Sequence, residues 1–92
     1  MDGALAEVLA QTVYIEGANV PFGELTHDQV RARADELRAV TGWGPTARVG
    51  AVALAWRQLA LAMEQAQAGR VGELPGDVLT ELAPRLWVVM PA

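Results

Sequence analysis

The sequence contains no cysteine, no serine and no lysine. Without cysteine the chain forms no disulfide and supplies no thiolate to a metal. The usual covalent nucleophiles are also missing, so covalent catalysis would depend on threonine, tyrosine or carboxylates. The single histidine, His27, follows a predicted helix cap, and the sequence places no acidic partner for it. We therefore expect no catalytic residues, no metal site, no cofactor and no enzymatic activity.

Positive charge is scarce and mixed with negative charge. The formal net charge is −4, and every cation is an arginine. Arginines cluster within residues 31–38, but carboxylates within residues 28–36 are interleaved with them. Nucleic-acid binding needs a continuous basic surface, and an anionic membrane surface needs the same. We expect neither nucleic acid nor a membrane as a partner.

Long hydrophobic runs are absent as well. The uncharged stretch 49–56 of the central apolar segment is far too short to cross a bilayer. Asp2 stands where a signal peptide would carry a positive charge. The sequence therefore predicts a cytoplasmic protein.

Hydrophobic periodicity predicts a single all-α domain over residues 1–92. The predicted architecture is a compact four-helix domain with an extended C-terminal segment, and its helices cover about residues 3–16, 27–41, 45–68 and 76–83. Much of the hydrophobic content is alanine, so few large side chains are available to form the core. Small cores of this kind are commonly supplemented by oligomerisation.

Local signals set the helix boundaries. Thr26 and Gln29 have the spacing of a capping box, which predicts the start of the second helix. Gly17 is placed to end the first helix in a left-handed conformation. Residues 12–16, TVYIE, are also rich in strand-forming side chains, so a strand is the alternative there. We favour a helix because the apolar face continues through them.

The helix predicted over 45–68 is apolar on two faces. One face is formed by Val49, Val52, Trp56, Leu59 and Met63. Leu54 and Leu61 lie on nearly the opposite side. These two leucines either pack beneath another element of the same chain or form an interface, for example in a two-fold helix pair with a second copy.

The C-terminal segment is the second interface candidate. Trp87, Val88, Val89 and Met90 form an uncharged run with strand propensity. If this run does not pack back onto the helices, it would be an exposed apolar patch, and strand addition to a partner is one use for such a patch.

The sequence predicts a small non-enzymatic protein–protein interaction or adaptor module, whose partner is another protein or a second copy. The alternative is a helical bundle that binds a small hydrophobic ligand in a pocket lined by Trp43, Trp56 and Met63. A saturable change in tryptophan fluorescence on adding a hydrophobic ligand would favour that alternative.

Overall fold

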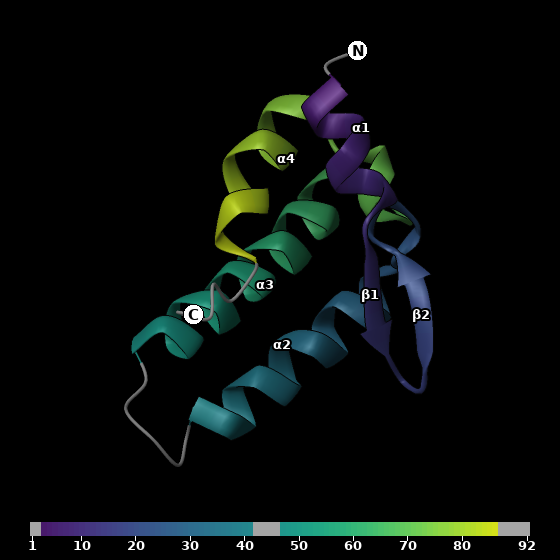
Figure 1. Cartoon of the computed structure of the whole chain (residues 1–92). Helices are drawn as coiled ribbons and strands as arrows, with labels where there is room; N and C mark the ends of the chain where they lie inside the picture. Colours follow the sequence, from purple (N-terminus) through teal and green to yellow (C-terminus); the bar gives the residue numbers. More distant parts are fainter. Residues whose placement is uncertain (1–2, 42–46, 87–92) are drawn as a thin grey trace.

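A computed structural model describes residues 3–41 and 47–86 (Figure 1). In chain order these residues form α1 (Gly3–Ala10), β1 (Thr12–Ile15), β2 (Ala18–Pro21), α2 (His27–Thr41), α3 (Ala47–Ala66) and α4 (Gly76–Leu82). The short 3-10 helices η1 (Phe22–Glu24) and η2 (Val71–Glu73) lie between these elements, and η3 (Ala83–Arg85) follows α4. Helices α2, α3 and α4 lie close to their predicted ranges.

The all-α prediction is wrong in the N-terminal part of the chain. The helix expected over 3–16 ends at Ala10, and β1 pairs with β2 in a two-stranded antiparallel sheet. Side chains in β1 alternate between exposed and buried, with Val13 and Ile15 in the core. This alternation is the pattern of a strand with one buried face, and it overrides the helical reading. The fold is mainly helical with one β-hairpin.

The turn of the hairpin explains why the strands form. Ile15 pairs with Ala18, so Glu16 and Gly17 alone connect the two strands. Both turn residues have positive φ, 52° and 83° respectively. Two successive residues of positive φ characterise the type I′ turn, whose twist matches that of paired strands. Gly17 is therefore left-handed as expected, but it serves a hairpin and not a helix end.

The start of α2 confirms the predicted capping box. The backbone N–H of Thr26 donates a hydrogen bond of 2.9 Å to Gln29 Oε1. The backbone N–H of Gln29 in turn donates one of 3.3 Å to Thr26 Oγ1. These reciprocal bonds satisfy amide groups that the first turn of a helix leaves without partners.

Helix α3 ends at Ala66, and the residue that follows in the left-handed conformation is not a glycine. Gln67 takes the left-handed conformation, with φ 54°, two residues before Gly69. The N–H of Ala68 bonds to the carbonyl of Met63 at 2.9 Å, and that of Gln67 to the carbonyl of Glu64 at 3.2 Å. This pair of bonds is a Schellman motif.

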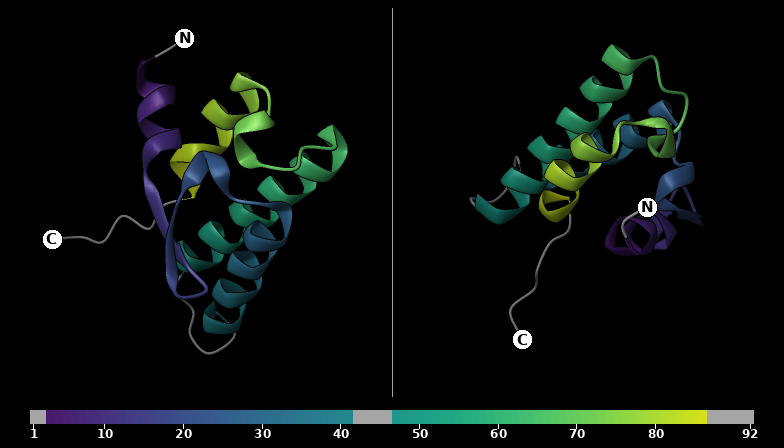
Figure 2. Two further views of the ribbon diagram at one scale, coloured as in Figure 1. Left: turned by 90° about the vertical axis from the view of Figure 1, so that its right-hand side faces the viewer. Right: turned by 90° about the horizontal axis from the view of Figure 1, so that it is seen from above.

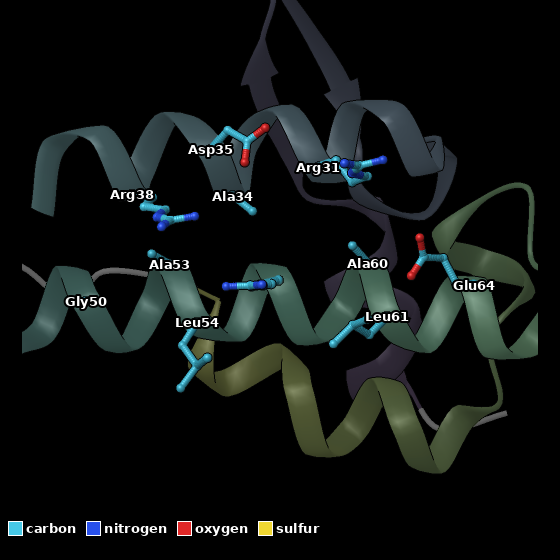
Figure 3. A pocket seen from close by; sticks show the side chains of 11 residues that line it. Arg31, Ala34, Asp35, Arg38, Gly50, Ala53, Leu54, Ala60, Leu61 and Glu64 are labelled. Atoms are coloured by element: carbon cyan, nitrogen blue, oxygen red, sulfur yellow. The ribbon is translucent and has the colours of Figure 1, made fainter. Parts of the chain in front are cut away.

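Helix α3 lies at the centre of the helical layer. It runs antiparallel to α2 along one side, while α4 lies along its other side (Figures 1 and 3). The hairpin and α1 lie at one end of this layer (Figure 2). The core face of α3 contributes buried side chains at Val52, Ala55, Trp56, Leu59 and Met63.

Trp56 links several elements of the core and is 2% exposed. Its ring packs edge-to-face on Phe22, with ring centroids 6.1 Å apart and planes at 89°. Its indole Nε1 donates a hydrogen bond of 3.0 Å to the carbonyl of Leu86. The guanidinium of Arg33 lies 5.9 Å from the centroid of the same ring and donates a hydrogen bond to the carbonyl of Tyr14. Trp56 therefore connects η1, α2, α3 and the segment after α4.

Backbone contacts also join the start of α2 to the segment after α3. Thr26 and Arg70 form an isolated antiparallel bridge, and the N–H of Val71 bonds to the carbonyl of Leu25 at 3.0 Å. Next to this bridge, η1 and η2 approach closely enough that a Cβ on Gly72 would lie 2.9 Å from the carbonyl oxygen of Gly23. The close approach requires glycine at position 72.

Candidate functional site

Helix α3 exposes the two leucines on the face opposite its core residues. Leu54 is 56% exposed and Leu61 is 49% exposed. They lie seven residues apart, so both project from the same side of the helix. Neither leucine is therefore part of the core. About half of each leucine side chain is therefore left uncovered by the other described elements.

A groove of about 540 Å³ runs between α2 and α3 beside the leucines (Figure 3). We call it the α2–α3 groove. Its lining residues are Arg31, Ala34, Asp35 and Arg38 from α2, and Gly50, Ala53, Leu54, Arg57, Ala60, Leu61 and Glu64 from α3. Between Gly50 and Glu64 the helix rises about 21 Å at 1.5 Å per residue. The groove is therefore long enough for about four turns of a partner helix.

The groove has an apolar side and a charged side. Leu54 and Leu61 project from α3 away from α2, whereas Arg38 reaches from α2 toward α3 (Figure 3). Small side chains, including Ala53 and Ala60, form the floor of the groove between these two sides. A bound segment could thus contact leucines along one edge and charged groups along the other.

Arginines outnumber carboxylates on the groove wall. Within residues 3–41 and 47–86, Arg31 and Arg57 take part in no ion pair, and both are exposed. Of the two carboxylates, Glu64 has its Oε1 atom 3.3 Å from His27 Nε2. His27 Nε2 forms no hydrogen bond within the described residues. The groove therefore presents two guanidinium groups, those of Arg31 and Arg57, without an ion-pair partner in the described residues.

The chemical groups of the α2–α3 groove are guanidinium, carboxylate and aliphatic side chains. In the described ranges, no group of three or more histidine, cysteine, aspartate or glutamate side chains is placed to hold a metal ion. The residues that line the groove include no hydroxyl or imidazole group. What this arrangement offers is apolar contact combined with guanidinium groups, which is the chemistry of binding.

The α2–α3 groove does not coincide with the pocket that the sequence predicts from tryptophan and methionine. Trp56 is buried in the core, and Met63 is 1% exposed on the same core face of α3. Neither side chain lines the α2–α3 groove. Trp43, the third predicted pocket residue, lies outside the described residues, as do the interface candidates Trp87, Val88, Val89 and Met90.

Sequence reasoning missed the contribution of α2 to the site. The alternating charges of residues 28–38 were used only as an argument against a continuous basic surface, and no site was assigned to Arg31, Asp35 or Arg38. The structure places these side chains on a groove wall opposite α3. The available signal was the spacing of Arg31, Ala34 and Arg38, which puts a small residue between two arginines on one helix face.

In the part of the chain that the structure describes, no helix combines the length and the apolar character needed to cross a membrane. Comparisons with models of protein families, with curated proteins and with solved structures find no match to this chain.

Proposed function

We propose that this chain is a small, non-enzymatic protein–protein interaction module that binds a protein partner at the α2–α3 groove. The observation that carries the proposal is the exposure of Leu54 and Leu61 on one face of α3, at the edge of the groove. Clustered apolar side chains at a concave, charge-rimmed surface are typical of interaction sites. A cytoplasmic location belongs to the same proposal.

Burial of the leucines supplies a driving force for association. Covering each half-exposed leucine would stabilise a complex by about 1 kcal/mol from apolar burial. The neighbouring small residues, Gly50 and Ala53, allow a partner backbone to come close to α3. The guanidinium groups then add specificity to an otherwise general apolar contact.

A small hydrophobic ligand is less well supported as the occupant. Such ligands favour enclosed pockets lined mainly by apolar and aromatic side chains. The aromatic and methionine side chains that would form such a wall, Trp56 and Met63, are already packed inside the core. The groove contains leucine but no aromatic residue, and charged side chains from both helices line it.

Selection of a displayed random-peptide library against the immobilised full chain tests the proposal. Each enriched peptide is then measured against the chain carrying Leu54→Gln with Leu61→Gln, which removes apolar surface without adding charge. We expect the enriched peptides to bind this variant at least about tenfold more weakly, since 1.4 kcal/mol corresponds to a factor of ten.

Tyr14→Gln is the matched control, because Tyr14 is a 63% exposed apolar side chain on the hairpin and does not line the groove. Peptides should bind this control as they bind the wild type. Enriched peptides whose affinity is unchanged by the two leucine substitutions would overturn the proposal. Circular dichroism verifies that every variant is folded.

A further inference from the structure

The charges of the α2–α3 groove identify the kind of partner it fits. We propose that the occupant is an acidic amphipathic helix of another protein, which packs apolar side chains on Leu54 and Leu61 and directs carboxylates toward the groove arginines. This inference rests on the proposed function, because it names the partner of the same site.

Charge complementarity is the first argument. The chain carries a net charge of −4, yet three of its seven arginines line this one groove. Arg31 and Arg57 have no ion-pair partner among residues 3–41 and 47–86. One of the two groove carboxylates, Glu64, lies against His27. A partner with carboxylates would form charge-assisted hydrogen bonds with these guanidinium groups. A basic partner would instead be repelled by them.

The shape of the site favours a helix over a strand. Both walls of the groove are α-helices, whose backbone groups bond within each helix and are not available to an extended peptide. Strand addition gains its affinity from unpaired backbone groups of a sheet edge. A partner helix satisfies its own backbone bonds, and its apolar residues repeat every seven positions, as Leu54 and Leu61 do.

A second copy of this chain fits the groove less well. In a two-fold antiparallel pair of α3 helices, both leucines are buried when Leu54 lies opposite Leu61 of the other copy. The same register places Arg57 one position away from Arg57 of the other copy, close to the symmetry axis. Two guanidinium groups would then face each other where carboxylates are needed, which disfavours the pair.

Three synthetic helical peptides that differ only in charge test the inference. Each has about 18 residues and the same leucine stripe at heptad spacing, and its flanking positions carry glutamate, glutamine or lysine. Affinities for the full chain are measured by fluorescence anisotropy at two salt concentrations. We expect the glutamate peptide to bind at least about tenfold more tightly than the lysine peptide, and the difference to shrink as salt rises.

A variant with Arg31→Gln and Arg57→Gln isolates the charge contribution. It should weaken binding of the glutamate peptide by about tenfold and leave that of the glutamine peptide unchanged. The Leu54→Gln, Leu61→Gln variant should weaken binding of all three peptides. Light scattering reports whether the free chain is a monomer under the same conditions.

The outcomes separate this inference from the proposed function. If the three peptides bind equally and the leucine substitutions weaken them all, the groove is an interaction site but the acidic-partner inference is overturned. Peptide affinities that are unchanged in both double variants would overturn the proposed function as well. Absence of binding by every peptide, or a dimer that only the leucine substitutions dissociate, would overturn the acidic helix as the occupant.

Discussion

The indole Nε1 of Trp56 donates a hydrogen bond of 3.0 Å to the carbonyl oxygen of Leu86, and both groups are buried. This bond connects the middle of α3 to the residue that follows η3. A buried carbonyl that loses its donor retains the cost of its removal from water. Trp56 therefore stabilises the fold through this hydrogen bond as well as through its packing.

Trp56→Phe should lower the free energy of unfolding by about 2–4 kcal/mol, because it leaves the Leu86 carbonyl unpaired and creates a small cavity. Urea denaturation followed by circular dichroism measures the change. Tyr14→Phe, which removes a hydroxyl from an exposed aromatic ring, is the control and should stay within about 0.5 kcal/mol of wild type. A loss below about 1 kcal/mol for Trp56→Phe would show that the hydrogen bond contributes little.

Two leucines on the same helix should respond very differently to truncation. Leu59 is fully buried, whereas Leu61 is half exposed two positions later. We expect Leu59→Ala to destabilise the fold by about 2–5 kcal/mol and Leu61→Ala by less than about 1 kcal/mol. Thermal and urea unfolding of both variants measure the difference. Similar losses at the two positions would mean that Leu61 is covered in the isolated chain.

Substitutions at two residues with a left-handed backbone, Gly17 and Gln67, should change the stability of the fold in opposite directions. Gly17→Ala places a Cβ at φ 83° in the hairpin turn and should destabilise the fold by about 1 kcal/mol or more. Gln67→Gly removes a Cβ at φ 54° in the Schellman motif and should stabilise it by up to about 1 kcal/mol. Denaturation midpoints that move in the same direction for both variants would contradict this account.

Alanine substitutions at Gly72 and Gly50 should also change the stability of the fold in opposite directions. A Cβ on Gly72 would meet the Gly23 carbonyl at 2.9 Å, while one on Gly50 would have nothing within 4 Å. Gly72→Ala should therefore cost about 1–3 kcal/mol through the forced separation of η1 and η2. Gly50→Ala, inside α3, should stabilise the helix by about 0.5–1 kcal/mol. Differential scanning calorimetry should show melting temperatures displaced in opposite directions.

Features determined by neighbours in sequence were predictable. The Thr26 and Gln29 capping box depends on a three-residue spacing, and Trp56 belongs to an apolar stripe that periodicity identifies as core. Residues 12–16 were not predicted correctly, because a short apolar run satisfies both helical and strand spacing. The two-residue connection Glu16–Gly17 was the signal that favours a hairpin.

The site depends on how distant elements pack, which one sequence does not specify. Periodicity placed Leu54 and Leu61 on a second face of α3, but their exposure depends on where α4 and the hairpin pack. The role of Arg31 and Arg38 as a groove wall requires α2 to lie beside α3. Local charge alternation on α2 looks the same whether the helix faces solvent or a groove.

The bridge between Thr26 and Arg70, with the bond from Val71 to Leu25, joins the start of α2 to the segment that follows α3. Residues 42–46 join α2 and α3 covalently at one end, and this bridge fastens them at the other, so the two helices form a closed ring. A ring of this kind restricts how far its long sides can separate. If a partner binds as proposed, it would meet groove walls whose spacing the fold restricts in advance, and ordering this side would cost little conformational entropy. The proposed site would then distinguish partners by whether their width and charge fit the spacing of α2 and α3.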